Sequence, residues 1–404
     1  MTTATPATGP GLPLGLSRIP WGRFFNLKAW RRWFSESLVQ SGRLTGLLAI
    51  ILLFFVRIDD PNWLQFLRAK VFDTYQQIKP RAFEPNSPVL IVDIDEKSIE
   101  QLGQWPWPRT TIAQIIDKLA EMNAKVIGFD VVFAESDRTS LRAIAESTTG
   151  IDAKTREAMR QARDNDDVLA EAIQKSGRVV LGQTIPDAPI KYKEERPTTS
   201  FVVVGDNPNK FMEQYQSLQR NILLIDNAAE GHGVFSLSGT FVDGISRDVP
   251  MVLVADGVRY PSLSLEMLRV SKGAKSIQIK SNDLTGISEL LMRPRGTRDY
   301  FSVPTDEAGR KKVYYTPHAA FQKNYVSAVD ILNGTIDPAR VADKMILIGT
   351  SAQGLRDVRA TPLDRVLPGV EVHANILENV FFVRRQNNLD ELGFRIAESL
   401  AHLG

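Results

Sequence analysis

The strongest constraint on the fold is an alternation, starting at residue 89, of short apolar runs with segments of helical pattern. The apolar runs are hydrophobic on both faces, as strands buried in a parallel sheet are, and they lie at 89–95, 125–133, 178–183 and 345–349. The helical patterns lie at 112–122, 153–175 and 372–383. Parallel strands need long connections, which helices supply. The sequence therefore predicts an α/β fold with a mostly parallel sheet and crossover helices.

The middle of the chain has a different pattern. Residues 250–260 predict a hairpin, because Asp256-Gly257 at its centre is a favoured two-residue turn. Residues 277–315 are polar and predict short antiparallel strands and loops. We find no internal repeat and no low-complexity block. One domain with an antiparallel insertion explains this pattern better than two separate domains.

The N-terminal part of the chain predicts a membrane anchor. Residues 1–57 contain seven basic residues and one acidic residue, and a basic segment before an apolar run keeps an N-terminus in the cytoplasm. The uncharged run 44–56 is shorter than the roughly 20 residues that cross a bilayer, so the helix is extended back to residue 38, with Arg43 reaching the membrane surface. We therefore predict a basic, partly disordered cytoplasmic tail at 1–37 and one transmembrane helix at 38–57. A buried helix or a signal-peptide core is the alternative, but no small-residue cleavage site follows Val56.

Composition excludes several classes of function. Cysteine is absent, which excludes disulfides and thiolate metal sites. The net charge of +2 gives no general signal for nucleic-acid binding. The four histidines have no metal-ligand spacing, and no phosphate loop, nucleophile elbow or kinase motif is present. No cofactor is predicted, and His373 is interpreted as a capping or packing residue.

Polar and aromatic residues follow three of the predicted strands. In open α/β sheets, ligands bind beyond the carboxyl ends of the strands, so these residues are expected to surround one cleft. The candidate residues are Asp93, Asp95, Trp105, Trp107, Arg109, Asp130, Thr350, Ser351, Gly354 and Asp357. Buried carboxylates are costly unless they are paired, and Arg109 is the expected partner for one of them.

Three interpretations of this cleft compete. The favoured one is a structural network in which Asp93 and Asp130 satisfy loop amides and Arg109. The second is a small-ligand pocket with Trp105 and Trp107 as walls and the carboxylates as polar anchors. The third is a divalent-metal site on Asp93, Asp95 and Asp130, although their spacing matches no known metal-binding loop.

Five segments in order along the chain carry a resemblance to a known family. They are Val92-Asp93-Ile94-Asp95 with Ser98 and Gly103-Gln104-Trp105-Pro106-Trp107-Pro108-Arg109; Val126-Ile127-Gly128-Phe129-Asp130 with Phe133; Asp243-Gly244 with Arg247 and Pro250; 344–349 with Gly354-Leu355, Asp357 and Thr361-Pro362; and Pro368-Gly369-Val370-Glu371-Val372-His373-Ala374-Asn375. Together they resemble the second type of CHASE domain (CHASE2-like), an extracellular sensor associated with cyclases and histidine kinases. The resemblance covers roughly residues 60–385. The chain departs from the family pattern at one segment. Where the family often has an Asn-Tyr-Arg-Gly-like strand end, this chain has Tyr314-Tyr315-Thr316-Pro317-His318.

The resemblance implies a protein of the bacterial inner membrane, with its N-terminus cytoplasmic and a periplasmic sensor at 58–385. Residues 386–404 are interpreted as the start of a connection to further membrane helices. Effectors in such proteins are class III nucleotide cyclases, diguanylate cyclases, or histidine or serine/threonine kinases, and we favour an adenylate or guanylate cyclase outside this chain. The expected partners are a small-molecule or periplasmic protein cue, the membrane and a second copy in a homodimer, with no nucleic acid. The rival hypotheses are an autonomous metal-dependent hydrolase and a structural envelope protein.

Overall fold

The computed structural model describes residues 42, 45–52, 61–237, 243–352, 354 and 357–385. The chain divides into two units between Leu67 and Arg68, and the domain described below is the second. The described part of the chain has no helix that is both long enough and apolar enough to span a membrane. Most of the predicted anchor at 38–57 lies outside the described residues, so the anchor stays a prediction.

Helices and strands alternate along the domain. The longer helices are α2 (Asn62–Ile78), α3 (Glu96–Leu102), α4 (Arg109–Glu121), α5 (Leu141–Ser147), α6 (Ala153–Gln161), α7 (Asn165–Ser176), α8 (Leu223–Ala228), α9 (Leu263–Ser271), α10 (His318–Phe321), α11 (Ala328–Leu332) and α12 (Gly369–Arg385). The strands are β1 (Val89–Ile94), β2 (Val126–Phe129), β3 (Val179–Gln183), β4 (Phe201–Gly205), β5 (Gln214–Tyr215), β6 (Gly231–Val234), β7 (Asp248–Pro250), β8 (Val252–Ala255), β9 (Val258–Pro261), β10 (Ile277–Asn282), β11 (Gly286–Met292), β12 (Phe301–Pro304), β13 (Arg310–Lys312), β14 (Tyr325–Ser327), β15 (Met345–Thr350), β16 (Val358–Arg359) and β17 (Leu367–Pro368).

Six of these strands form the parallel sheet that the sequence predicts. Their order is β14-β1-β15-β2-β3-β6, and each described pairing is parallel. β1 lies between β14 and β15, with Val89 opposite Met345 and Asp93 opposite Gly349. Every residue of β1 is buried, as expected of a strand covered on both faces.

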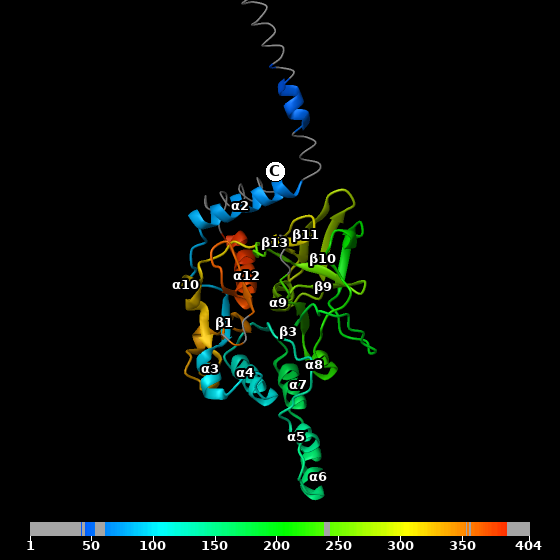
Figure 1. The fold of residues 1–404 in the computed structure, drawn as a ribbon, viewed down its shortest axis with the longest axis vertical. Helices are drawn as coiled ribbons and strands as arrows, with labels where there is room; N and C mark the ends of the chain where they lie inside the picture. Colours follow the sequence, from blue (N-terminus) through cyan, green and yellow to red (C-terminus); the bar gives the residue numbers. More distant parts are fainter. Residues whose placement is uncertain are drawn as a thin grey trace, which may run out of the picture. The chain divides into compact units, whose positions relative to one another are not determined.

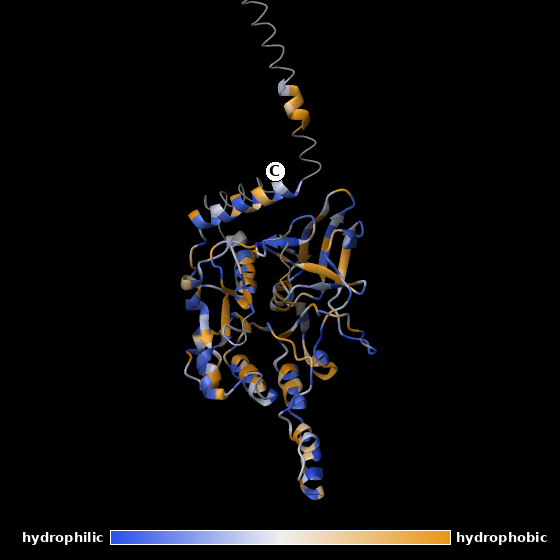
Figure 2. Ribbon diagram, viewed as in Figure 1, coloured by the Kyte–Doolittle hydropathy of each residue, from blue (hydrophilic) through white to orange (hydrophobic). Residues whose placement is uncertain are grey.

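Alternate residues of the strands point into two separate cores. Leu90, Val92 and Ile94 pack with α4, α7 and α11 on one face. Val89 and Ile91 point the other way and share a core with α9, α12 and the strands β10 to β12. In Figure 1, α12 lies between β1 and the antiparallel strands, while α5 and α6 project away from the sheet. Figure 2 shows β1 and α12 as mainly hydrophobic and α2 as mixed.

The predicted antiparallel insertion is confirmed. β10, β11 and β12 pair antiparallel, and β4 is added to them in parallel at the edge of β10. β8 and β9 form the predicted hairpin. Its turn places Asp256 at φ 48° and Gly257 at φ 74°, the left-handed pair that a tight hairpin turn requires.

Glycines let α9 lie close to the parallel sheet. A Cβ atom at Gly233 in β6 would lie 2.5 Å from the Cα atom and 2.7 Å from the backbone nitrogen of Leu263, at the start of α9. A Cβ atom at Gly128 in β2 would instead meet the side chain of Met267, further along the same helix. Helix backbone cannot move aside as a flexible side chain can.

We therefore expect Gly233→Ala to lower the free energy of unfolding by about 2–3 kcal/mol, as overpacking of a well-filled core does. The matched change Gly128→Ala is expected to cost about 1 kcal/mol, because the Met267 side chain adapts. Urea unfolding followed by circular dichroism measures both values. Equal losses in the two variants would contradict a backbone contact at Gly233.

Candidate functional site

The carboxyl end of β1 is fixed by the loop that follows β15. Asp93, which is 6% exposed, accepts hydrogen bonds from the backbone nitrogen of Ser351 at 2.9 Å and from its hydroxyl at 2.6 Å. The hydroxyl of Thr350 donates to the carbonyl of Ile94 at 3.1 Å. Burial raises the pKa of Asp93 to about 6, although the hydrogen bonds from Ser351 oppose the rise. Asp93, Thr350 and Ser351 therefore meet at the predicted edge of the sheet.

The shifted pKa of Asp93 makes a pH-dependent contribution to stability. A carboxyl whose folded pKa is raised destabilises the fold when ionised, and this effect disappears as the pH falls from about 6 to about 4. Asp93→Asn keeps one acceptor for Ser351 and removes the charge. We expect the variant to be more stable than the wild type by about 2–3 kcal/mol at pH 7, with the difference vanishing near pH 4.

Thermal unfolding of both proteins between pH 4 and pH 7 tests this expectation. Asp299→Asn, at an exposed aspartate, is the control for a general loss of charge. A pH-independent difference between wild type and Asp93→Asn would contradict a raised pKa at this position.

Asp95 faces a different neighbour. Its carboxylate accepts from the backbone nitrogen of Ser98 at 2.8 Å, which caps α3, and from the hydroxyl of Ser327 at 2.8 Å. The hydroxyl of Ser98 also accepts from the backbone nitrogen of Val329 at 3.1 Å. Asp95 thus joins β1 to β14, whereas Asp93 joins β1 to β15.

A pocket of about 460 Å³ opens beside these strand ends and contains part of the predicted cleft. Trp105 and Gly354 line it, together with Glu96 and Glu100 of α3. Trp107 lies beneath Trp105 in an edge-to-face contact with the ring centroids 5.3 Å apart, and it is 2% exposed. The carboxylates of this pocket therefore come from α3 and not from the three predicted aspartates.

Asp130 and Asp357 form a separate acidic pair near the start of α12. Burial, reinforced by the charge of Asp357, raises the pKa of Asp130 well above its ordinary value, and the charge of Arg359 opposes the rise. Arg359 binds Asp357 at 2.8 Å, and the backbone nitrogen of Gly369 donates to the carbonyl of Asp357 at 2.7 Å. Arg359 and the backbone nitrogen of Gly369 therefore hold Asp357 in the loop before α12, and the charge of Asp357 disfavours ionisation of Asp130.

The structure corrects the expected partner of Arg109. Its guanidinium pairs with Asp166 at 3.5 Å and donates to the carbonyl of Glu135 at 3.0 Å, and its backbone nitrogen donates to Asp137 at 2.8 Å. None of its hydrogen bonds or ion pairs involves Asp93 or Asp130. The physical reason is that the loop after β2 and the start of α7 converge on the start of α4, so they supply the nearer carboxylates.

The geometry gives no support to a metal site. Among the residues that the structure describes, no three His, Cys, Asp or Glu side chains are arranged to hold a metal ion. Asp93 binds Ser351, Asp95 binds Ser98 and Ser327, and the charge nearest in effect to Asp130 is that of Asp357. Among the described residues, the structure therefore gives no geometric support to the hypothesis of a metal-dependent hydrolase.

A buried cluster next to Asp93 was missed by the sequence analysis. Glu371, at the start of α12, accepts from the hydroxyl of Tyr325 at 2.7 Å and contacts Nδ1 of His318 at 2.6 Å. The hydrogen bond to Glu371 raises the pKa of His318, and the charges of Asp364 and Asp93 add to the rise. Glu371 lies in the segment that resembles the closing helix of the family, which was the available signal.

His373 is a packing residue, as the sequence analysis proposed. It is fully buried, and its ring lies 2.9 Å from the hydroxyl of Ser264 and 3.0 Å from the carbonyl of Phe235. Burial lowers the pKa of His373 to about 4, so the ring is neutral at physiological pH.

The second missed feature is a backbone segment, 313–316, held by one side-chain amide of α2, that of Gln76. Gln76 is fully buried. Its Nε2 donates to the carbonyl of Val313 at 3.1 Å, and its Oε1 accepts from the backbone nitrogen of Tyr315 at 2.9 Å. One glutamine thus replaces the hydrogen bonds that a neighbouring strand would make. We call residues 313–316 the clamped segment.

Helix α12 holds the opposite edge of the clamped segment. Asn379 accepts from the backbone nitrogen of Tyr314 at 2.9 Å and donates to its carbonyl at 3.0 Å. One turn earlier, Asn375 accepts from the backbone nitrogen of Thr316 at 3.0 Å. Arg81, in the connection from α2 to β1, donates to Asn375 at 2.8 Å and pairs with Glu378. The clamped segment therefore joins the helix at the start of the domain to the helix at its end.

Comparison with known proteins gives one match. The family model described as "CHASE2 domain" matches residues 45–400. No curated protein matches the chain, and no solved structure does.

Proposed function

Because the chain belongs to the CHASE2 domain family, a family of sensory domains of signalling proteins, we propose that it is the extracytoplasmic input module of a membrane-bound bacterial signal-transduction protein. The module receives a cue outside the cytoplasm and passes a change of conformation to an effector. A cue drives such a change only if it has different affinities for two states of the domain.

The observation that carries this proposal is the clamped segment. A sensor must couple the body of the domain to the chain segments that enter and leave it. Gln76 of α2 and Asn379 of α12 bind opposite edges of the same four residues, so a shift of either helix breaks or moves hydrogen bonds to the other. This arrangement suits a device that transmits movement between the two ends of the domain.

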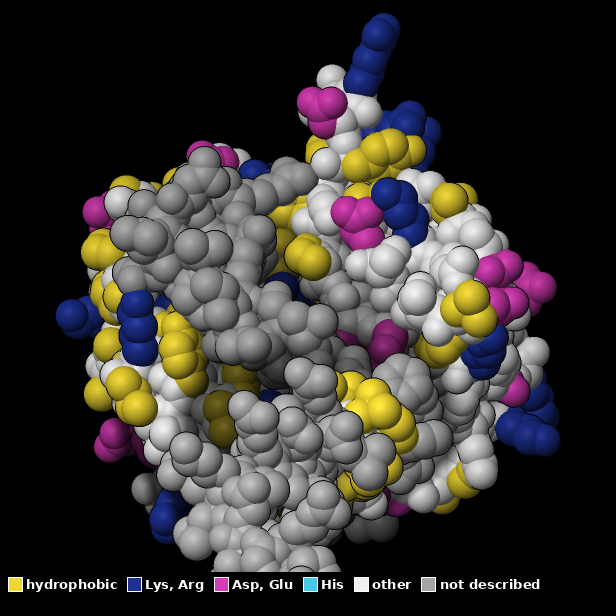
Figure 3. All heavy atoms as spheres, turned by 90° about the horizontal axis from the view of Figure 1, so that it is seen from above, with side chains coloured by type: hydrophobic (Ala, Val, Ile, Leu, Met, Phe, Trp, Pro, Cys, Tyr) yellow, Lys and Arg dark blue, Asp and Glu magenta, His cyan; other side chains and the backbone are white. Residues whose placement is uncertain are grey.

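The surface of α2 supports a location next to a membrane. Val71 and Ile78, two turns apart on this helix, are 64% and 80% exposed. Exposed apolar residues at helical spacing are typical of helices that lie at a membrane surface. Figure 3, which views the molecule from above, shows hydrophobic side chains among both basic and acidic ones.

Residues 148–152 connect α5 to α6, are mostly exposed and form neither helix nor strand, so they offer a site for a topology test. We expect alkaline phosphatase inserted after Gly150 to be active, because this enzyme folds only outside the cytoplasm. Activity of β-galactosidase but not of alkaline phosphatase at this position would overturn the extracytoplasmic placement.

The effector that we propose is a class III adenylate or guanylate cyclase, with a histidine or serine/threonine kinase as the alternative. This choice rests on the family alone. We further propose a homodimer as the signalling unit and a small molecule or periplasmic protein as the cue. Cyclic AMP and cyclic GMP measured in cells that express the complete gene distinguish a cyclase from a kinase.

A further inference from the structure

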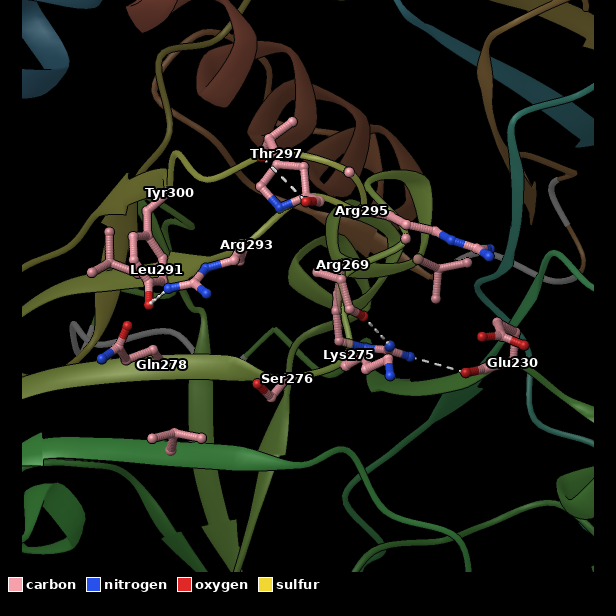
Figure 4. Close-up of a pocket in the computed structure, with 16 residues that line it drawn as sticks. Glu230, Arg269, Lys275, Ser276, Gln278, Leu291, Arg293, Arg295, Thr297 and Tyr300 are labelled. Carbon is pink, nitrogen blue, oxygen red and sulfur yellow. Dashed lines mark hydrogen bonds between the residues drawn. The ribbon is translucent and has the colours of Figure 1, made fainter.

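A large pocket lies outside the predicted cleft, between the end of α9, the strands β4, β10 and β11, and the loop 293–300 (Figure 4). Its volume is about 980 Å³, within the range of pockets that hold small organic molecules. Val202 of β4 and Leu291 of β11 contribute apolar surface to it. The pocket is thus concave and large enough for a metabolite.

One arginine that lines this pocket is already paired with protein groups. Arg269 of α9 binds both carboxylate oxygens of Glu266, at 2.7 and 2.9 Å. Its remaining donors reach the carbonyls of Ala274 at 2.7 Å and Glu230 at 2.9 Å. Glu266 therefore neutralises Arg269, whose role is to hold the end of α9 against the start of β6.

Three further cations surround the same space. Lys275, Arg293 and Arg295 line it; among the described residues no ion pair is found for Lys275 or Arg295, and Arg293 contacts the ring and hydroxyl of Tyr300. Glu230 is the one acidic side chain among the described residues that line the pocket. In Figure 4, Lys275 lies beside Arg269, with Arg295 to one side and Arg293 to the other. The pocket therefore has an excess of about two positive charges.

These cations are placed by backbone structure. Gly273, at φ 60°, turns the chain out of α9 and directs it into β10, which brings Lys275 to the pocket. The backbone nitrogen of Arg295 donates to the carbonyl of Lys272 at 2.9 Å, which ties the loop 293–300 to the end of α9. Lys275 and Arg295 therefore come from two elements that are joined directly.

We infer that this pocket binds a small organic anion with at least two negative charges, carried by carboxylate or phosphate groups. Cations without carboxylate partners around an open, concave pocket attract such a ligand, and arginine matches the geometry of both groups. The apolar wall accommodates the carbon skeleton. The identification of this anion as the cue rests on the proposed sensory function. The binding of an anion to the pocket does not depend on that function.

The pocket is connected to α12 by aromatic contacts. The loop 293–300 leads into Phe301, whose ring lies 6.1 Å from that of Phe381 in α12. The ammonium of Lys272 lies 4.8 Å from the centroids of both rings. An anion that draws this loop towards Lys275 would move Phe301 against α12, the helix that also holds the clamped segment.

Calorimetric titration of the full chain in detergent tests the inference. Succinate and citrate are the carboxylate probes, glucose 6-phosphate and inorganic phosphate are the phosphate probes, and glucose is the neutral control. We expect at least one charged probe to bind and glucose not to bind. We expect Lys275→Glu combined with Arg295→Glu to weaken binding at least about tenfold, because it replaces attraction by repulsion.

The matched control is Lys154→Glu combined with Arg160→Glu, which makes the same change of net charge on the exposed helix α6. Lys275 and Arg295 are exposed, as are Lys154 and Arg160, so both double variants are expected to fold. Their melting temperatures verify this. The inference is overturned if no charged probe binds, or if the α6 variant weakens binding as much as the pocket variant. The alkaline phosphatase test does not involve a ligand. A failure of the titration to show anion binding would therefore leave the proposed extracytoplasmic placement unaffected.

Discussion

Replacing Arg247 by methionine is expected to lower the free energy of unfolding by about 3–5 kcal/mol at pH 7, the usual cost of breaking a buried ion pair. Arg247 is 3% exposed and binds Asp73 of α2 through two hydrogen bonds, at 2.7 and 2.8 Å. It also binds Asp243 at 2.9 and 2.7 Å. The variant leaves Asp73 as a buried carboxylate without its main partner, which explains the size of the loss.

The same change predicts a pH dependence. Hydrogen bonds from Arg247 hold the pKa of Asp243 well below its ordinary value. A carboxyl with a depressed folded pKa contributes stability above its unfolded pKa of about 4, and the contribution is lost as the pH falls. We therefore expect the difference between wild type and Arg247→Met to narrow below about pH 4.

Urea unfolding at pH 7 and at pH 3 measures both effects. Arg142→Met is the control, because the side chain of Arg142 is 56% exposed and lies 4.0 Å from Asp164, and such a pair is expected to contribute less than about 1 kcal/mol. A loss below about 1 kcal/mol in Arg247→Met would show that the ion pair does not hold α2 to the domain.

The strands of the parallel sheet that lie in apolar runs could be predicted, and the two strands outside such runs, β14 and β6, were missed. β1 and β15 each have six residues and are almost entirely apolar, so both were predicted close to their observed ends. β14 has three residues, and β6 has four, of which two are glycine. Glycine is a poor strand former, and in β6 it is required by the close approach of α9. Tertiary packing, and not local preference, therefore selects these two strands.

Helix boundaries show a similar limit. The charged stretch 153–175 was predicted as one helical segment, but it forms α6 and α7. Asp164 separates them, because its carboxylate accepts from the backbone nitrogen of Asp166 and caps α7. An aspartate in a charged helical pattern resembles any other surface residue, so its capping role becomes visible once the backbone is known.

The position of the candidate cleft could be predicted from topology, but its pairings could not. Parallel strands end at one edge of the sheet, and this rule brings Asp93 and Ser351 together. It does not say which carboxylate reaches Arg109, because that depends on where the start of α7 lies. The partners of Gln76 are more distant still, with the clamped segment 237 residues away along the chain. A polar residue on an amphipathic helix is expected to be exposed, so no local signal identifies Gln76 as buried.

The clamped segment gives the second large prediction. Gln76→Leu removes the partners of two buried backbone groups, the carbonyl of Val313 and the nitrogen of Tyr315. Each unsatisfied buried group costs about 1–3 kcal/mol, so we expect a total loss of about 4 kcal/mol. Gln77→Leu, at the exposed neighbour whose amide donates to the carbonyl of Pro362 at 3.0 Å, is expected to cost about 1 kcal/mol or less.

Gln76→Glu separates loss of the hydrogen bonds from loss of packing. A carboxylate still accepts from Tyr315 but repels the carbonyl of Val313, and burial disfavours its charge, so its folded pKa is raised. Such a group destabilises the fold when ionised, and protonation restores a donor to Val313. We therefore expect Gln76→Glu to be unstable at pH 7 and to recover most of its loss as the pH falls towards 4, whereas Gln76→Leu remains unstable. Urea unfolding of both variants across this range is the measurement. If the stabilities of Gln76→Glu and Gln76→Leu change with pH in the same way, the clamped segment is held by packing and not by the amide of Gln76. The proposed connection between α2 and α12 would then be wrong.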